Sequence, residues 1–124
     1  MTAIGHLAYA TINSTDPRRL ADFYGALLDL EVGWEGGAFI ALKRPAEHAA
    51  TLAFQRVDDP ADRSRAHVDI HVPDVATAVA RVLELGGSEV AKVAELGLRW
   101  RVMADPDGNH FCLLPETAAA AEAE

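Results

Sequence analysis

The chain has 124 residues, of which 50% are hydrophobic, enough apolar material for one compact domain or for two small modules that share a core. Its 11 Lys and Arg residues against 19 Asp and Glu residues give a formal net charge of -8, which argues against a nucleic-acid partner and favours a neutral or cationic ligand. The single cysteine excludes an intrachain disulfide, and the lack of a secretion signal and of an apolar run near the roughly 20 residues of a membrane span predicts a cytoplasmic protein with no membrane partner.

The first half of the chain is predicted to begin with a strand and a helix. Residues 5–13 alternate in character, with Ala8, Ala10 and Ile12 on one face and Leu7, Tyr9 and Thr11 on the other. Asp16 suits a helix N-cap and Pro17 the first helical position. The helix that follows has a predicted buried stripe at i, i+3, i+4 spacing, made of Leu20, Phe23, Tyr24, Leu27 and Leu28.

Three more strands complete this half. Residues 30–35 and 38–43 read as a hairpin that turns at Gly36-Gly37, and residues 51–57 read as the next strand. Residues 58–65 are polar, contain Pro60, and form the one stretch that resembles a linker.

The second half repeats this order. Residues 67–72 form a predicted strand, and Asp74 caps a helix that ends at Gly86-Gly87. The predicted buried stripe of that helix is Val75, Ala78, Val79, Val82 and Leu83. Residues 88–93 and 98–104 are two strands joined near Gly97, residues 105–109 form a turn, and residues 110–114 form the last strand.

The two halves align at an offset of 58 residues, which places Asp16 on Asp74 and Tyr9 on His67. We therefore predict an α+β fold of two tandem β-α-β-β-β modules in an open, cup-shaped mixed sheet. The modules are expected at residues 1–58 and 59–115, together forming one domain, with a frayed Ala/Glu tail at 116–124. An open sheet of this size predicts a homodimer that covers an edge.

The strand at residues 66–72 has one apolar and one titratable face. Alternation places Val68, Ile70 and Val72 toward a helix and His67, Asp69 and His71 toward a shared hollow. One interpretation is acid/base catalysis by His67 and Asp69, since histidine titrates near neutral pH. The other is a polar, solvated face without chemistry.

A family resemblance enters at three places in the sequence. Residues 66–74, the turn and strand at residues 103–114, and Asp22-Phe23-Tyr24 in the first helix are similar to the vicinal oxygen chelate superfamily. This superfamily includes glyoxalase I, extradiol dioxygenases, methylmalonyl-CoA epimerase, and bleomycin- and fosfomycin-resistance proteins. The chain most resembles its small glyoxalase-like members, over residues 5–115.

The resemblance implies four metal-ligand positions, usually His or Gln, Glu, His and Glu. They fall on Tyr9, Gln55, His67 and Cys112, of which His67 alone keeps the usual residue type. Because both carboxylates are missing, a hard octahedral cation such as Mg²⁺ or Mn²⁺ is not expected here. If any metal binds, His67 is the best candidate ligand.

Other residues leave alternatives open. Zn²⁺ accepts the ligand types of His67, Asp69, His71 and Cys112. Cys112 is either a nucleophile or a small core residue, and Tyr9 either contacts a ligand or packs. Trp100 either stacks on a ring or cation or packs against protein, and Trp34 is a second candidate for stacking, from the first module. Trp100 lies on the strand face opposite Arg99 and Arg101.

The histidines outside the central strand are assigned smaller roles. His110 shares a strand face with Cys112 and is a candidate for the hollow, whereas His6 and His48 are expected to be structural.

Two function classes follow from these residues. The first is a protein that binds a small cationic or aromatic molecule without a cofactor, through Tyr9, Gln55, His67, Asp69, His71, Trp100 and Cys112. The second is a lyase, isomerase or dioxygenase that uses either a divalent metal or His67 and Asp69 as catalytic acid and base.

Overall fold

The computed structural model describes residues 3–47, 49–59, 65–95 and 97–116. His48, much of the predicted linker and nearly all of the predicted tail lie outside the described residues. The chain divides into two compact units, Ala8–His67 and a second made of Met1–Leu7 with Val68–Glu124. The division falls within strands β1 (His6–Ser14) and β5 (Ala66–Val72).

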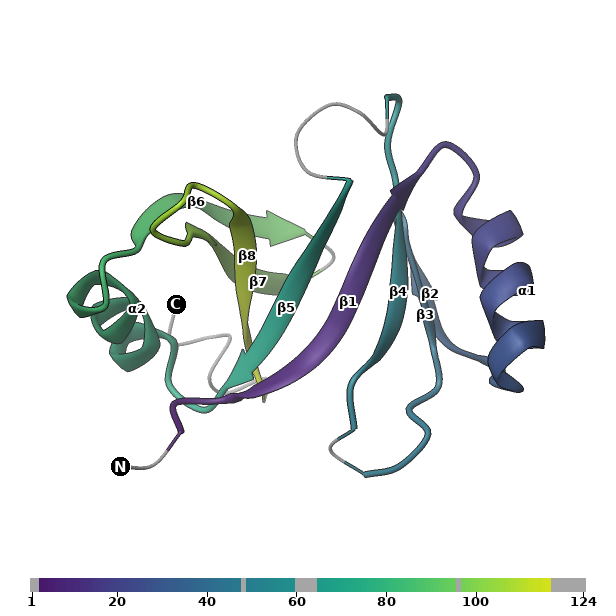
Figure 1. Cartoon of the computed structure of the whole chain (residues 1–124), viewed down its shortest axis with the longest axis horizontal. Coiled ribbons are helices and arrows are strands. Elements are labelled where there is room, and N and C mark those ends of the chain that lie inside the picture. The colour runs from purple at the N-terminus through teal and green to yellow at the C-terminus, as the bar shows by residue number, and fades with distance from the viewer. Residues whose placement is uncertain (1–2, 48, 60–64, 96, 117–124) are drawn as a thin grey trace. The chain divides into compact units, whose positions relative to one another are not determined.

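In the unit Ala8–His67, α1 (Pro17–Leu28) covers one face of four strands (Figure 1). These strands are β1, β2 (Val32–Gly36), β3 (Phe39–Leu42) and β4 (Thr51–Arg56). Their order is β2-β3-β4-β1, with β1 and β4 parallel and the other pairs antiparallel. The core beneath α1 contains Ala21, Ile40, Leu42 and Phe54.

The first helix begins where the sequence predicts. The Asp16 carboxylate accepts a hydrogen bond from the backbone N–H of Arg19 at 3.3 Å, and Pro17 is the first helical residue. Helix α1 ends at Leu28, after which Asp29 adopts a left-handed conformation with φ of 55°. This αL residue ends the helix in the way that is more often supplied by glycine.

The predicted buried stripe of α1 is wrong in part. Leu20 and Tyr24 pack against the core, and the Tyr24 ring stacks on Phe54 at 5.7 Å between centroids. In contrast, Phe23, Leu27 and Leu28 are exposed, because the helix places Ala21 rather than these larger side chains against the sheet.

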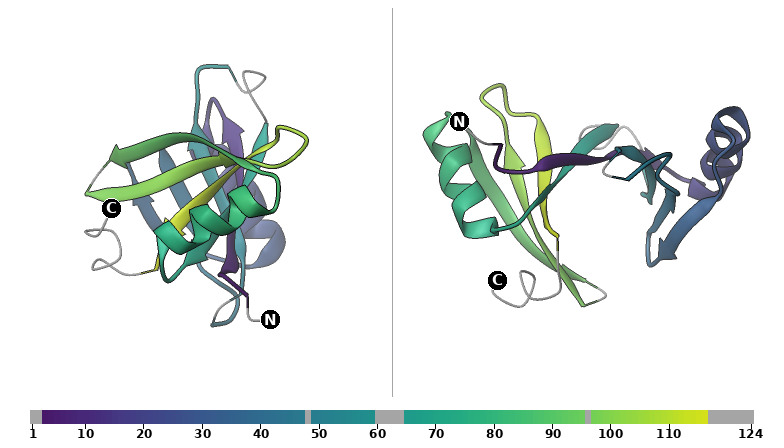
Figure 2. Two further views of the ribbon diagram at one scale, coloured as in Figure 1. Left: turned by 90° about the vertical axis from the view of Figure 1, so that its left-hand side faces the viewer. Right: turned by 90° about the horizontal axis from the view of Figure 1, so that it is seen from below.

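In the second unit, α2 (Val75–Glu84) packs on one face of four strands (Figure 2). These are β5, β6 (Ser88–Glu95), β7 (Leu98–Ala104) and β8 (His110–Pro115), in the order β5-β8-β7-β6. Strands β5 and β8 are parallel, and the other pairs are antiparallel. The core beneath α2 contains Val72, Val75, Ala78, Met103 and Leu113.

Three details of this unit differ from the predictions. Asp74 is the N-cap of α2, but its carboxylate accepts a hydrogen bond from the Thr77 hydroxyl and caps no backbone N–H. Leu83 is exposed, because the core contacts of α2 are made by its other apolar positions. Val68 is also exposed, because the core beneath α2 includes Ile70 and Val72 of the same strand but not Val68.

The turn between β7 and β8 forms as predicted. The Asp105 carboxylate accepts hydrogen bonds from the backbone N–H groups of Asp107 and Asn109, each at 2.9 Å. The hydrogen bonds from Asn109, that of its side chain foremost, lower the pKa of Asp105. Gly108 supplies the positive φ, 89°, that the turn requires.

The predicted α+β class with two β-α-β-β-β modules and mixed strand pairing is confirmed. The module boundaries at 1–58 and 59–115 stay a prediction. Among the described residues, neither helix is long and apolar enough to cross a bilayer.

Candidate functional site: a His, Asp and Cys group on two parallel strands

Strand β5 separates its apolar and polar side chains as its alternation predicts. Ile70 and Val72 pack into the core beneath α2. Asp69 points to the opposite face and is nevertheless buried, with 7% of its surface exposed. A buried carboxylate needs hydrogen-bond partners, because its desolvation is costly. The neighbours of Asp69 therefore define the candidate site.

Three side chains meet on this face. His67, Asp69 and Cys112 each offer a metal-ligand type of atom, and these atoms all lie within 4.8 Å of one another. Asp69 and Cys112 are register partners in the parallel pairing of β5 with β8, so their side chains leave the sheet on the same side. His67 precedes Asp69 by two residues and shares its face.

The thiol of Cys112 is tied to this carboxylate. Burial, and then the charge of Asp69 and a hydrogen bond to its carboxylate, raise the pKa of the Cys112 thiol well above its ordinary value. Cys112 is 8% exposed and is a free cysteine. A nucleophilic or metal-ligating cysteine acts as the thiolate. This environment favours the protonated form and opposes nucleophilic catalysis.

His71 does not join the group. Its ring meets the ring of His6 edge to face, with 5.4 Å between centroids, and His6 in turn contacts Glu116 at 3.3 Å. His71 lies two residues beyond Asp69, about 6.6 Å along the strand at the usual rise. The structure thus brings together three of the four residues considered for Zn²⁺.

The other predicted ligand contacts in the unit Ala8–His67 lie on β1 and β4. The Tyr9 ring has the Arg44 guanidinium 5.5 Å from its centroid. Gln55 follows the buried Phe54 and is half-buried on the strand face that points away from α1. Their proposed roles, and the four-position set implied by the family resemblance, stay predictions.

The remaining candidates lie on β2, β7 and β8. Trp100 is half-buried and Trp34 is exposed. The hairpin of β6 and β7 places Trp100 opposite Val93, and His110 lies opposite Ala104 across β7 and β8. The sequence alone does not single out Lys92, which lies opposite Arg101 in this hairpin. The turn at Gly97 sets the register of the hairpin and would have predicted that the two cations lie opposite each other.

The donor chemistry of the group suits one kind of metal ion. Zn²⁺ accepts imidazole, carboxylate and thiolate ligands, at distances of about 2.0–2.3 Å that place tetrahedral donors about 3.4 Å apart. Separations of up to 4.8 Å therefore call for small side-chain rotations. The set does not suit Mg²⁺ or Mn²⁺, which prefer several oxygen ligands. His67, Asp69 and Cys112 would hold Zn²⁺, which supplies Lewis-acid chemistry when bound.

Comparison with known families decides the identity of the fold. The family model described as glyoxalase-like domain matches residues 9–114. The chain belongs to the glyoxalase-like domain family. It is thereby a member of the superfamily that its sequence resembles. No curated protein sequence gives a significant match.

Solved structures of glyoxalase-like proteins share this fold. Methylmalonyl-CoA epimerase from Mycobacterium tuberculosis is 16% identical with a TM-score of 0.70, over 94% of this chain and 92% of that one. A glyoxalase/bleomycin resistance protein/dioxygenase superfamily member from Vibrio splendidus 12B01 is 16% identical with a TM-score of 0.63, over 90% and 99%. The Mn(II)-bound glyoxalase from Novosphingobium aromaticivorans is 17% identical with a TM-score of 0.65, over 94% of this chain but 40% of that one.

Proposed function

We propose that this glyoxalase-like protein binds a small organic molecule without the metal of its metal-dependent relatives, using His67 and Asp69 as polar contacts. The observation that carries this proposal is the burial of the Cys112 thiol beside the Asp69 carboxylate, since the two residues are register partners of β5 and β8 and are 8% and 7% exposed. Burial and the charge of Asp69 favour the protonated thiol, so one of the three candidate metal ligands is in a form that does not bind metal. A metal ion that binds Cys112 would have to displace that proton.

The chemical class of the ligand follows from charge and from the aromatic residues. A net charge of -8 and the buried Asp69 favour a neutral or cationic molecule. Trp100 and Trp34 are candidates to stack on a flat ring or on a cation. A solved relative by fold, methylmalonyl-CoA epimerase, is described in complex with methylmalonyl-CoA, which supports small-molecule binding as the general role.

The test is a thermal-shift screen of cationic and aromatic small molecules on protein stripped of metal by a chelator. Compounds that raise the melting temperature are titrated by calorimetry against wild type, His67→Ala and His6→Ala. We expect His67→Ala to weaken binding at least tenfold while the protein stays folded, because His67 is half-buried on the polar face of β5. His6→Ala is the matched control, since His6 lies outside the three-residue group.

Two outcomes contradict this assignment. Equal weakening by His6→Ala would show that any loss of a histidine near this sheet has the same effect. Unfolding of His67→Ala would show that His67 is structural and that the site is misplaced.

A second candidate is a metal-dependent lyase, isomerase or dioxygenase, or a metal-free acid/base catalyst built on His67 and Asp69. The separation of at most 4.8 Å between the three donor atoms favours it. Elemental analysis of untagged protein after incubation with Zn²⁺, Mn²⁺, Fe²⁺ or Ni²⁺ and desalting tests the metal arm. About one metal per chain, lost in His67→Ala, would support it; no retained metal in any sample would favour metal-free binding.

Cobalt gives that experiment a spectroscopic readout. Bound Co²⁺ that contacts a thiolate produces a sulfur-to-metal charge-transfer band in the near ultraviolet. If Cys112 is a ligand, Cys112→Ser abolishes this band while Co²⁺ still binds through His67 and Asp69. A band that persists in Cys112→Ser would exclude the cysteine as ligand.

We further propose that the protein is a cytoplasmic homodimer. The single cysteine is a free thiol, which suits a reducing compartment. Strands β2 and β6 end the strand order and offer unpaired edges, and a second copy can cover such an edge. Light scattering behind size exclusion is expected to give twice the mass of the chain, and fractionation of cells is expected to place the protein in the cytoplasm.

A further inference from the structure

A small pocket lies on the α2 side of the hairpin formed by β6 and β7. Its volume is about 250 Å³, and it is lined by Val75, the first residue of α2, and by residues of both strands. Three of the lining residues are the cations Lys92, Arg99 and Arg101. The proposed small-molecule site of His67 and Asp69 does not include them.

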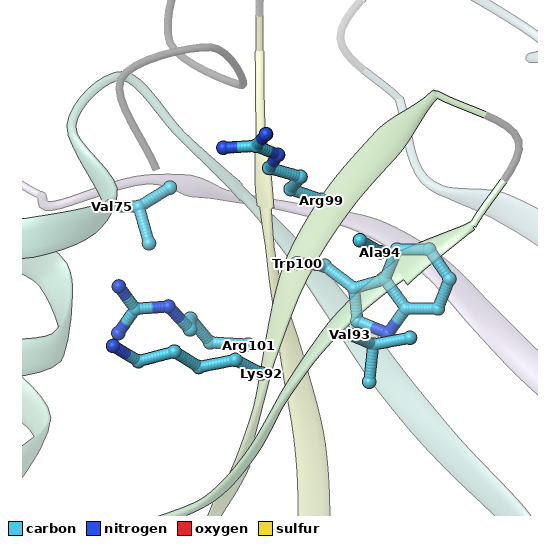
Figure 3. Close-up of a pocket in the computed structure, with 7 residues that line it drawn as sticks. All are labelled: Val75, Lys92, Val93, Ala94, Arg99, Trp100 and Arg101. Atoms are coloured by element: carbon cyan, nitrogen blue, oxygen red, sulfur yellow. The ribbon is translucent and has the colours of Figure 1, made fainter.

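The register of the hairpin explains why the cations gather. Lys92 lies directly opposite Arg101, and the next same-face position pairs Ala94 with Arg99. Side chains two residues apart on a strand share a face, so all three cations leave the hairpin on one side. Figure 3 shows them on the side of Val75, whereas Trp100 lies on the other side, as the sequence predicts.

The positive charge of this pocket is only partly balanced. Arg101, whose side chain is 13% exposed, is paired with Glu89 at 2.5 Å. Within the described part of the chain, Lys92 and Arg99 have no ion-pair partner. Like charges placed opposite each other destabilise a sheet. Three of the 11 basic residues of an acidic chain therefore meet here, and among the described residues an acidic partner is found for Arg101 alone.

We propose that this pocket binds a small soluble phosphate ester through Lys92, Arg99 and Arg101. A phosphate monoester carries about -1.5 to -2 charges near pH 7, which matches the charge of Lys92 and Arg99. An arginine guanidinium donates two parallel hydrogen bonds to phosphate oxygens, and a lysine adds a point charge. Ala94 leaves the space between these side chains open.

The size of the pocket limits what the phosphate is attached to. Its volume of about 250 Å³ is below the roughly 300–1,000 Å³ of pockets for drug-sized ligands. It is also several times the roughly 30 Å³ that one water molecule occupies in the liquid. A phosphate group with a short organic part fits between these limits, and Val75 supplies an apolar wall for that part.

This site is independent of the proposed function. Arg101 and Arg99 leave β7 on the side of α2, whereas Asp69 and Cys112 point away from the core beneath α2. Loss of one site therefore does not entail loss of the other.

The test is a titration of the full chain, at constant ionic strength, with inorganic phosphate, glycerol 3-phosphate and acetate. Nitrogen-15 NMR reports which backbone amides respond, and calorimetry gives the Kd. We expect saturable shifts at residues 92–94 and 99–101, with glycerol 3-phosphate binding more tightly than phosphate and acetate binding much more weakly. Absence of saturable shifts, or equal affinity for acetate, would overturn the proposal.

Three variants and a control assign the effect to the pocket. Lys92→Gln and Arg99→Gln are each expected to weaken phosphate binding at least tenfold. Arg99→Lys is expected to weaken it less, because lysine keeps the positive charge but cannot donate two parallel hydrogen bonds to the phosphate. Both side chains are exposed, so the variants keep the fold. Arg19→Gln makes the same change in net charge at an exposed position on α1 and is expected to alter Kd less than twofold.

Two further results would overturn the assignment. Equal weakening by Arg19→Gln would indicate a general charge effect. Co-sedimentation with phosphatidylcholine vesicles that contain phosphatidylserine, lost in Arg99→Gln, would indicate a lipid headgroup instead of a soluble ester.

Discussion

Replacement of Cys112 tests whether a hydrogen bond from its thiol to the Asp69 carboxylate stabilises the fold. Both residues are more than 90% buried, so water cannot take over the bond. A hydrogen bond to a charged group contributes about 1.5–3 kcal/mol, and a thiol is a weak donor, which places this bond near about 1.5 kcal/mol. Loss of the buried sulfur adds about 0.8 kcal/mol, the value of one methylene group. Cys112→Ala should therefore lower the free energy of unfolding by about 2 kcal/mol.

The control keeps a donor in place. Cys112→Ser retains a hydroxyl that donates to the Asp69 carboxylate, so it should lose only about half as much stability as Cys112→Ala. Urea unfolding followed by tryptophan fluorescence measures both, and Trp100 lies on β7, the strand that pairs with the strand of Cys112. A Cys112→Ala protein as stable as wild type, or a Cys112→Ser protein less stable than Cys112→Ala, would refute the role given to this bond.

Alkaline pH tests the burial of the Cys112 thiol, which is the largest cause of its raised pKa. The pKa of the native thiol is raised, so below the unfolded value of about 8.5 both states are protonated and the stabilisation is complete. Above it the unfolded chain loses a proton that the native chain keeps, and stability should fall by up to about 1.4 kcal/mol per pH unit. Cys112→Ser lacks this slope. Parallel stability curves for the two proteins above about pH 8.5 would contradict the raised pKa.

Three other substitutions test the two units separately. Phe54→Ala should cost about 3–5 kcal/mol of stability, measured by urea unfolding, because Phe54 is fully buried beneath α1. Gly87→Ala should cost about 1–3 kcal/mol in the same assay, since its Cβ would lie 2.7 Å from the Ala104 carbonyl oxygen. Asp105→Ala should lower the melting temperature at neutral pH, because it removes the acceptor for Asn109. The native pKa of Asp105 is lowered, so its stabilisation is present above the unfolded pKa and is lost as pH falls through the native value; a difference between Asp105→Ala and wild type that persists in acid would contradict this.

The sequence predicted the elements well because its local signals agree with one another. Asp16 and Pro17 mark the start of α1, and the Asp105 turn separates β7 from β8, both as expected. The faces of α1 were harder to predict. Leu20, Tyr24 and Leu27 follow helical spacing, but apolar residues cover more than one stripe of this helix. Only the sheet determines that Ala21 faces inward while Leu27 is 68% exposed.

The candidate site was predictable only in part, because some of it follows from local alternation and the rest from contacts between distant strands. Alternation along β5 places His67 and Asp69 on one face, and this is a local property. The pairing of Asp69 with Cys112 depends on the register of two parallel strands that are distant in the chain, which no local pattern encodes. The ring contact between His71 and His6 likewise depends on a strand, β1, that is distant from β5 in the chain.

The raised pKa of the Cys112 thiol also separates the two candidate functions by their pH dependence. A metal ion that binds through Cys112 takes the thiolate, so its binding releases the thiol proton and its apparent affinity rises steeply with pH. A small molecule that contacts His67 and Asp69 leaves the thiol protonated and shows no such dependence. Titrations of Zn²⁺ and of a screened ligand at several pH values therefore distinguish the two. Proton release on Zn²⁺ binding that is absent from Cys112→Ser would make the cysteine a ligand, and affinity independent of pH would leave the thiol paired with its carboxylate.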